Sequence, residues 1–529
     1  MRIAPARSTA LAVIAVVVLV LGLVVVGESV RADEGRGDEA AVAAAGTGAD
    51  DPVVTEAESG LDVGDGSGER PNIVLISTDD MTVSDLEWMP KTRELLGDQG
   101  LSFERALSPH PLCCPARGAI LTGQYAQNNG VKSNQDPYAF SALHADTALP
   151  VWLHKAGYRT AFTGKYLNGF GTKGPRQPGW DDWDATMNGQ YAYTPFQMAN
   201  NGDFQWYYDI NNVDYINQRV NRLVDTWAPS DQPFFIWASQ VAPHGRLDKL
   251  RGISSTAAAF PPARFAEKFA NVKSPSLQDP AIGEDTAGKN TLVQGKNAPS
   301  EDKINTVFRS RIRSLQAVDE GVEQLVQHLD DAGELDNTYI FFTSDNGFLL
   351  GEHNLLTKNV PYRQAIRVPM LVRGPGITPG AVREQRALMI DLAPTFADIA
   401  DADPLVTVDG VSLLPTLFDG APLRETTLIQ AGPQQPADRD YGWWWRGVST
   451  DRYTYARFFA DGIEELYDHD RDPSEVDNVA QDPAYAAVLD ELRARTQALV
   501  TCRSGAECSR TFGPDPVPTG DPADAAAGS

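Results

Sequence analysis

The sequence predicts an α/β protein with a large mixed, mostly parallel sheet flanked by helices, and a smaller C-terminal subdomain with an antiparallel sheet and a helix. Short apolar runs that end in polar residues alternate with helical patterns, which is typical of buried parallel strands joined by helices. From about Leu423 the sequence becomes rich in Trp, Tyr and Thr, as in antiparallel strands. The 529 residues suffice for one large core with an appendage.

The first apolar run opens the folded part of the chain. In "RPNIVLISTDDM", the residues from Ile73 to Ile76 are apolar, mostly β-branched, and followed by polar residues, which predicts a buried strand. Parallel strands of α/β proteins carry ligands at their carboxyl ends. Asp79 and Asp80 therefore lie where a site is expected.

Helical and strand patterns alternate along the rest of the main domain. Residues 89–100 predict a helix that ends in glycine, and residues 149–166 predict a helix, a turn at Gly157 and a strand. Residues 232–245 and 337–347 each predict an apolar strand with a polar end. The sequence therefore predicts at least three strands whose carboxyl ends carry polar side chains.

These strand ends predict a metal site. Hard divalent cations such as Ca²⁺ and Mg²⁺ take carboxylate and amide oxygens as ligands. Either acidic pair alone is also typical of an ordinary loop, so the prediction requires the ends to lie together. The polar residues at the three strand ends are Asp79, Asp80, His244, Asp345 and Asn346.

The chain is predicted to have five parts. Residues 441–459 read as antiparallel strands and residues 483–500 as a helix, and a Pro- and Ala-rich stretch follows. Residues 33–70 are Gly, Ala, Asp and Glu with little that could form a core. The parts are a signal peptide or anchor (1–32), a disordered linker (33–70), a main domain (71–422), a C-terminal subdomain (423–512) and a disordered tail (513–529).

The N-terminus predicts export. Arg2 and Arg7 precede an apolar run over residues 9–27, and Val30 and Ala32 follow at the small-residue spacing of a cleavage site. The run is also nearly long enough to span a bilayer, so an uncleaved N-terminal anchor is the alternative. Either way, we expect a secreted or extracytoplasmic protein, with membrane contact only if the segment is uncleaved.

The charge balance excludes some partners. The formal net charge is −26, whereas binding to nucleic acid or anionic lipid needs clustered Lys and Arg. We therefore expect neither as a main partner.

Export places the four cysteines in an oxidising setting. Cys502 and Cys508 enclose a short loop and are predicted to form a local disulfide. Cys113 and Cys114 remain. Adjacent cysteines rarely bridge each other, so one interpretation is two buried structural thiols.

The stretch "PLCCPARGAILTG" supports a second interpretation. Pro115 suits the first turn of a helix, and Arg117 then lies near Cys113. A helix N-terminus with a guanidinium forms an anion site. In that field we expect Cys113 to have a depressed pKa and to be reactive.

The same residues resemble a known family. Cys113-x-Pro115-x-Arg117 followed by "LTG" resembles the signature of the type I sulfatases, in which the first cysteine is oxidised after translation to Cα-formylglycine. The resemblance covers roughly residues 71–510, including "GYRTAFTGKYLNGF", "APHG", "TSDNGFLLGEHNLLTK", "IRVPMLVRGPGI" and "ELYDHDRDPSEVDNVA". The "CCP" doublet, "GKYLN" and the C-terminal cysteine loop look most like the N-acetylglucosamine-6-sulfatase branch. The resemblance implies an alkaline phosphatase/sulfatase-like fold.

The resemblance also implies a calcium site and a covalent nucleophile. One hydroxyl of the hydrated aldehyde at Cys113 attacks sulfur, and the other later expels sulfate by regenerating the carbonyl. Cys114 is implied to be a buried spectator. The implied Ca²⁺ ligands are Asp79, Asp80, Asp345, Asn346 and the modified Cys113.

The remaining implied roles concern charge and protons. Arg117, with Ca²⁺, favours ionisation of the nucleophile, while Lys165 and Lys358 neutralise the sulfuryl oxygens. His244 donates a proton to the leaving alcohol, together with Lys358.

One position departs from the family pattern. Many sulfatases have Gly-Lys-Trp-His where this chain has "GKYLN", so Leu167 stands where a second histidine is expected. The N-acetylglucosamine-6-sulfatase branch shares this departure. His110 and His353 are candidate substitutes, and the alternative for each is a substrate contact or a structural role.

The sequence thus predicts a sulfuric ester hydrolase that cleaves a sulfated carbohydrate or an aryl sulfate, with a formylglycine-generating enzyme as its maturation partner. One alternative is a phosphodiesterase or phosphonate monoester hydrolase of the same superfamily, and another is a non-catalytic binder of sulfated glycans. Aromatic residues in 443–445 and 189–196 either stack on sugar or aryl rings or pack in the protein.

Overall fold

A computed structural model of the protein describes residues 70–170, 175–187, 191–246, 258–433 and 441–520. The predicted signal peptide or anchor and all but the last residue of the predicted linker lie outside the described residues. Among the helices of the described part, none is both long and apolar enough to cross a membrane.

The larger sheet has ten strands within the described residues. Strands β8, β1, β7, β3 and β4 run parallel in its centre, and antiparallel pairings join β5, β6, β9 and β2 toward the edges. The strands, in order across the sheet, are β10 (Ala381–Arg383), β2 (Leu101–Phe103), β9 (Met370–Arg373), β8 (Thr338–Ser344), β1 (Asn72–Asp79), β7 (Phe234–Pro243), β3 (Arg159–Gly164), β4 (Asp182–Met187), β5 (Phe196–Asn200) and β6 (Asp203–Tyr207). This mixed, mostly parallel sheet confirms the predicted fold class.

Strand β1 lies at the centre because both of its faces are apolar. Ile73 and Leu75 belong to one hydrophobic cluster, and Val74 and Ile76 belong to another. Successive side chains of a strand point to opposite faces. A near-continuous apolar run is therefore what a sheet covered on both faces requires.

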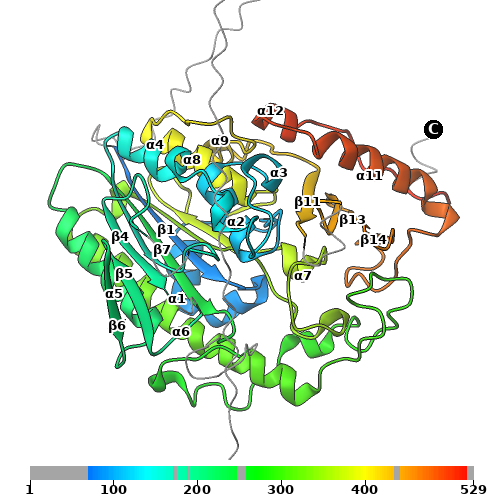
Figure 1. The fold of residues 1–529 in the computed structure, drawn as a ribbon, viewed down its shortest axis with the longest axis horizontal. Helices are drawn as coiled ribbons and strands as arrows, with labels where there is room; N and C mark the ends of the chain where they lie inside the picture. Colours follow the sequence, from blue (N-terminus) through cyan, green and yellow to red (C-terminus); the bar gives the residue numbers. More distant parts are fainter. Residues whose placement is uncertain (1–69, 171–174, 188–190, 247–257, 434–440, 521–529) are drawn as a thin grey trace, which may run out of the picture. The chain divides into compact units, whose positions relative to one another are not determined.

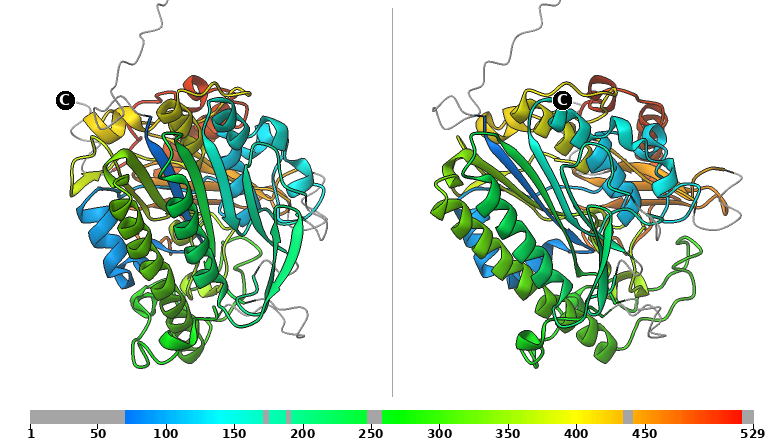
Figure 2. Two further views of the ribbon diagram at one scale, coloured as in Figure 1. Left: turned by 90° about the vertical axis from the view of Figure 1, so that its left-hand side faces the viewer. Right: turned by 60° about the vertical axis from the view of Figure 1, so that its left-hand side comes forward.

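Helices cover the two faces of this sheet, as Figure 1 and Figure 2 show. The face of Val74 packs against α5 (Asn212–Trp227) and α6 (Glu301–Asp331). The face of Ile73 packs against α2 (Cys113–Thr122), α4 (Leu149–Lys155) and α8 (Leu392–Ala400). The other helices are α1 (Pro90–Thr92, continued by a π-helical turn over Arg93–Asp98), α3 (Ala126–Asn129), α7 (Arg363–Ile366), α9 (Leu414–Asp419), α11 (Ala486–Leu499) and α12 (Gly505–Cys508).

A second, four-stranded sheet follows in the C-terminal part. Its antiparallel strands are β11 (Thr427–Ala431), β12 (Trp445–Ser449), β13 (Tyr453–Phe458) and β14 (Glu464–Asp468). Leu428 and Ile429 belong to the same hydrophobic cluster as Ile73 of the larger sheet. The predicted boundary at residue 423 therefore separates two sheets but not two cores.

The end of the described chain differs in part from the prediction. Cys502 and Cys508 form the predicted disulfide. The composition predicts disorder from residue 513, yet Asp515 accepts hydrogen bonds from Thr450 at 2.5 Å and from Arg495 at 2.9 Å. These bonds hold that part of the tail beside the C-terminal sheet, so the prediction of disorder is wrong there.

Candidate active site

The carboxyl ends of β1 and β8 bring the predicted acidic residues together. The two strands pair in parallel, with Thr78 opposite Ser344, so the residues that follow them meet at one edge of the sheet. The Asn346 side-chain amide donates to Asp80 Oδ1 at 2.6 Å, and the Asp80 backbone N–H lies 3.3 Å from Asp345 Oδ1. These acidic side chains are buried, so their charges need compensation.

Helix α2 points its N-terminus at this edge. It begins at Cys113 and ends before Gly123, whose φ of 65° suits a glycine C-cap. Cys113 Sγ lies 3.5 Å from Asp79 Oδ1 and 2.8 Å from Lys358 Nζ. The predicted helix therefore places Cys113, and not Cys114, among the acidic residues.

Arg117, one turn further along α2, is bound entirely by protein groups. Its guanidinium donates to Asp345 Oδ2 at 2.9 Å and to Asp79 Oδ2 at 3.4 Å, and its Nη1 bonds the Lys165 carbonyl and Ser239 Oγ. Burial alone would lower its pKa, but Asp345 and Asp79 outweigh this and raise it. Arg117 thus holds the two carboxylates in place.

Two lysines supply the other positive charges. Lys165, at the end of β3, bonds Asp79, and Lys358 bonds Asp80. Burial would raise the pKa of Asp79, but Lys165, His244, Lys358 and Arg117 together hold it well below its ordinary range. Asp79 is therefore ionised at neutral pH.

His244 follows β7 and faces the same cluster. Its Nε2 lies 3.5 Å from Asp80 Oδ2, its Nδ1 lies 2.7 Å from the Gly245 carbonyl, and its ring stacks on Tyr191 at a centroid distance of 4.0 Å. Burial lowers the pKa of His244 to about 4, although Asp80 and Asp79 oppose this. The imidazole is therefore neutral at pH 7.

The cluster has the donor set of a metal site. One ligand atom from each of Asp79, Asp80, Cys113 and His244 lies within 4.8 Å of the others. Asn346 Oδ1 is buried and has no hydrogen-bond donor among the described residues. A buried amide oxygen without a donor beside three carboxylates suits a hard cation.

The expected depression of the Cys113 pKa is wrong. Burial, together with Asp79 and Asp345, raises the pKa of the thiol, and Lys165 and Lys358 only partly oppose this. The prediction considered the helix N-terminus and Arg117, but the guanidinium is neutralised by the carboxylates. The pKa of Cys113 is thus set by burial and two acids, against two lysines.

Three residues of the site were not predicted. Asn168 donates to the Tyr191 hydroxyl at 2.7 Å, and this hydroxyl lies 4.0 Å from Cys113 Sγ. Ser239 joins Arg117 to the Lys165 carbonyl. Asn168 lies in "GKYLN", a stretch of the family resemblance, and Tyr191 lies in the aromatic stretch 189–196, for which only ring stacking or packing was considered.

Other candidates lie outside the cluster. His110 accepts from the Gly432 backbone at 3.2 Å, and His353 stacks on Tyr362 and contacts Glu284 at 3.0 Å. Leu167 is in the hydrophobic core. Cys114 Sγ lies 3.8 Å from the Asn168 carbonyl, and burial raises the pKa of this thiol well above its ordinary value.

The aromatic stretch 443–445 packs within the protein. All three tryptophans are buried, and Trp445 Nε1 donates to the Asn359 carbonyl at 3.1 Å. Lys132 and Arg446 lie over the ring of Trp443, 4.8 Å and 3.8 Å from its centroid. The packing interpretation therefore holds for this stretch, whereas Tyr191 of 189–196 faces the site.

The sheet and the cluster at its edge define an α/β protein with a buried, metal-type site at the strand ends. The chain matches the sulfatase family over residues 71–402 and the family described as "N-sulphoglucosamine sulphohydrolase, C-terminal" over residues 351–501. Because the first match alone spans more than half of the chain, the protein belongs to the sulfatase family, within the alkaline phosphatase-like superfamily.

Known relatives agree with this assignment. The chain is 34% identical over 370 residues to the N-acetylglucosamine-6-sulfatase of Homo sapiens, covering 66% of this chain and 64% of that protein. It is 35% identical over 364 residues to the extracellular sulfatase SULF-1 homolog of Drosophila melanogaster, covering 66% of this chain and 31% of that protein. The chain thus spans less than two thirds of the length of these relatives.

A solved structure shares the fold. It is that of a protein in complex with its substrate D-glucosamine-2-N,6-O-disulfate. The TM-score is 0.70 at 23% identity, and the match covers 81% of this chain and 97% of that one. Identity at this level supports the fold alone.

Proposed function

We propose that the protein is a Ca²⁺-dependent sulfuric ester hydrolase that acts on a sulfated carbohydrate or an aryl sulfate through a formylglycine formed from Cys113. One observation carries this: Cys113 Sγ lies at the N-terminus of α2, 3.5 Å from Asp79 and 2.8 Å from Lys358. The thiol stands where the hydroxyl groups of hydrated formylglycine would be. Membership of the sulfatase family supports the same reaction.

The cation would be held by the oxygen atoms at the ends of β1 and β8. Bound Ca²⁺ would lower the cost of ionising the nucleophile and draw charge from a sulfate oxygen. The chain contributes the rigidity: Arg117 holds Asp79 and Asp345 by its Nη2 and Nε atoms. The ligands would be Asp79, Asp80, Asp345 and Asn346, with the modified Cys113.

The nucleophile depends on the modification. Hydrated formylglycine would supply one hydroxyl to attack sulfur and a second whose deprotonation restores the aldehyde and releases sulfate. Lys358 Nζ, 2.8 Å from Sγ, would neutralise charge on the sulfuryl oxygens. Lys165 holds Asp79 in its ionised form and lies 4.3 Å from the Tyr191 ring centroid.

Two groups would take part in protonating the leaving alcohol. The pKa of Lys358 is well above its ordinary value, because Asp80, Cys113 and Asp79 outweigh its burial, so this ammonium retains its proton. His244 has a pKa of about 4 because of burial, and a bound sulfate ester adds negative charge that would raise it. In this proposal His244 is the proton donor and Lys358 supports it.

The relatives support a proposal for the substrate class and the location. One relative is named an N-acetylglucosamine-6-sulfatase, another is named an extracellular sulfatase, and a structural neighbour binds a glucosamine disulfate. We therefore propose a sulfated glycan as substrate, with residues 1–32 directing export or anchoring the chain. A formylglycine-generating enzyme would act during maturation.

Peptide mass spectrometry across residues 111–123 tests the proposal most directly. We expect the mass loss that accompanies replacement of the Cys113 thiol by an aldehyde, with Cys114 unchanged. The matching assay compares an aryl sulfate with an aryl phosphate diester, and faster turnover of the diester would favour the phosphodiesterase alternative. An unmodified Cys113 in active protein would overturn the formylglycine mechanism.

Calcium removal provides a second test. Chelation should lower turnover and melting temperature together, because three buried carboxylates would lose a divalent partner. Turnover and melting that stay unchanged after verified metal removal would refute the proposed calcium site.

A further inference from the structure

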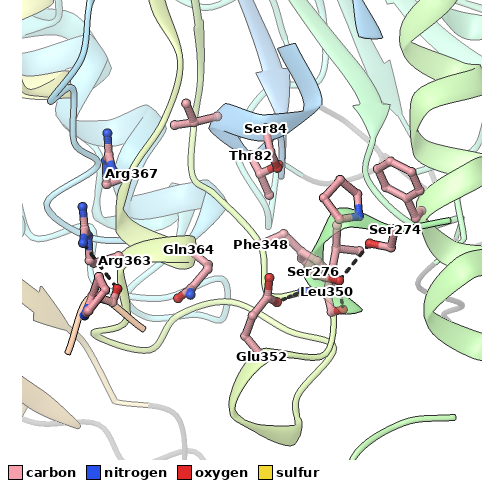
Figure 3. A pocket seen from close by; sticks show the side chains of 14 residues that line it. Thr82, Ser84, Ser274, Ser276, Phe348, Leu350, Glu352, Arg363, Gln364 and Arg367 are labelled. Atoms are coloured by element: carbon pink, nitrogen blue, oxygen red, sulfur yellow. Dashed lines mark hydrogen bonds between the residues drawn. The ribbon is translucent and has the colours of Figure 1, made fainter. Parts of the chain in front are cut away.

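Two neighbouring cavities lie beside α7, and Arg363 and Arg367 line both of them. Figure 3 shows these arginines and Gln364 on one side of the first cavity, with Ser274 and Ser276 on the other. No residue predicted for the metal cluster lines either cavity. The cavities are therefore a separate feature of the described chain.

The first cavity, of about 260 Å³, combines hydroxyl groups with apolar surface. Its lining also includes Phe348, Leu350 and Glu352 (Figure 3). Sites that mix hydrogen-bonding hydroxyls with aromatic surface suit small polar ligands with an apolar face, of which a sugar ring is one. The hydroxyl-bearing residues are Thr82, Ser84, Ser274 and Ser276.

The second cavity, of about 240 Å³, has four arginines in its lining. Arg386 and Arg105 are each paired with Asp451, at 2.9 Å and 2.6 Å. The chain as a whole carries a net charge of −26. Four guanidinium groups around one cavity are therefore unusual for this acidic protein. The four are Arg105, Arg363, Arg367 and Arg386.

Among the described residues, the guanidinium groups of Arg363 and Arg367 form no salt bridge with a carboxylate; the one carboxylate beside Arg363, that of Glu475, accepts from its backbone N–H at 2.7 Å. Arg367 donates to the Glu104 carbonyl at 2.5 Å, and Arg363 donates to the Pro473 carbonyl at 3.4 Å. Each guanidinium has five N–H donors, so several on each remain for a ligand.

The electrostatic state of Arg367 agrees with this. Burial, together with Arg363, Arg386 and Arg105, lowers the pKa of Arg367 to about 10. The like charges repel one another in a partly desolvated space. An anion bound between them would relieve that repulsion.

We propose that these cavities form a second site, which binds the sulfate or carboxylate group of an anionic sugar. The oxyanion accepts hydrogen bonds from Arg363 and Arg367, and the sugar ring lies in the hydroxyl-lined cavity. Guanidinium groups suit this role because they bind planar or tetrahedral oxyanions through two parallel hydrogen bonds. The site goes beyond the proposed hydrolysis, and its failure would leave that proposal intact.

The same chemistry has two sources, a free inorganic oxyanion and an oxyanion carried on a glycan. Calorimetric titration of the full-length Cys113→Ala protein, which cannot turn substrate over, separates them with two probes: inorganic sulfate and a sulfated heparin disaccharide. Each is compared in Arg363→Gln and in the control Arg264→Gln. Arg264 lines a different cavity and is already paired with Asp214 and Glu320.

We expect Arg363→Gln to weaken binding of both probes at this site about tenfold, the loss typical of one charge-assisted hydrogen bond, and Arg264→Gln to change neither. When Cys113 is retained, so that the protein is active, Arg363→Gln should not change the inhibition of aryl sulfate hydrolysis by sulfate. That inhibition reports binding at the metal cluster.

Each other outcome is decisive. Weakened sulfate binding with unchanged disaccharide binding would support an oxyanion site but overturn the sugar as its ligand. Equal affinities in Arg363→Gln and Arg264→Gln for both probes would overturn the site. Arg363→Gln should not disturb the fold, because the Arg363 backbone N–H, and not its side chain, donates to Glu475.

Discussion

The metal-type cluster and the arginine-lined cavity beside α7 are both rich in cations, but they balance charge differently. In the cluster, Arg117, Lys165 and Lys358 each bond a carboxylate. Beside α7, the side chains of Arg363 and Arg367 bond only backbone carbonyls within the part of the chain that the structure describes. The charges of the cluster are therefore balanced within the protein, whereas the guanidinium groups of Arg363 and Arg367 have no such balance and, in our proposal, bind a ligand.

Substitution of the two adjacent cysteines should give the largest effect. Cys113→Ala should reduce turnover roughly 10⁴-fold or more, as loss of a covalent nucleophile does, because its Sγ lies between Asp79 and Lys358. Cys114→Ala should stay largely active. Turnover of an aryl sulfate, with the melting temperature as the folding control, checks this. Comparable losses in two well-folded variants would contradict the assignment of Cys113 over Cys114.

The charge comparison itself is tested by two arginines. Arg117→Gln should cost about 3 kcal/mol of unfolding free energy or more, because it leaves buried Asp79 and Asp345 partly uncompensated. Arg363→Gln should change stability by about 0.5 kcal/mol or less, since no acid depends on it. Urea unfolding in calcium-containing buffer measures both. Equal losses would break the distinction between positioning and ligand-binding cations.

The pH dependence of stability tests the charge state of Glu352, which lines the first cavity. Burial raises its pKa to about 7, so the folded state holds a proton that the unfolded state releases near pH 4.5. Wild-type protein should therefore lose stability as pH rises from about 4.5 to about 7, by about 3 kcal/mol relative to Glu352→Gln. Exposed Glu87 gives the control, Glu87→Gln. Parallel stability curves for Glu352→Gln and wild type would show that Glu352 ionises normally.

The smallest effect separates two roles for His244. An activated nitrophenyl sulfate leaves without much help, whereas a sugar alcohol needs a proton. His244→Ala should therefore reduce hydrolysis of a glucosamine 6-sulfate about 10²-fold more than that of the aryl ester. The protein must first be shown to retain formylglycine and Ca²⁺. An equal loss on both substrates would make His244 a residue that positions sulfate instead.

The local sequence pattern was enough to predict the strands whose two faces are both covered by helices. The apolar, mostly β-branched run from Ile73 to Ile76 predicted a buried strand, and the β1–β8 register brings Asp79 and Asp345 together. The edge strands β5 and β6 were not predicted. Phe204 of β6 is exposed, and such edge strands carry no continuous apolar run to mark them.

The site was predicted less completely, for a physical reason. Cys113 and Arg117 lie four positions apart on one helix, so spacing alone relates them. Tyr191 and Ser239 come from distant segments, and only the tertiary fold joins them to Cys113 and Arg117. The prediction of a depressed Cys113 pKa was wrong for the same reason. Cys113 is on α2, whereas the carboxylates around it lie at the ends of β1 and β8.

The hydrophobic cluster that joins the two sheets determines which fragments of the chain can exist alone. A polypeptide that stops at residue 422 would retain every predicted catalytic group but would lose Leu428, Ile429 and Trp445 from that cluster. The apolar surface they cover would be left open to water. We therefore expect both sheets to fold as one unit, and a protein truncated at residue 422 should aggregate and not fold as a smaller domain.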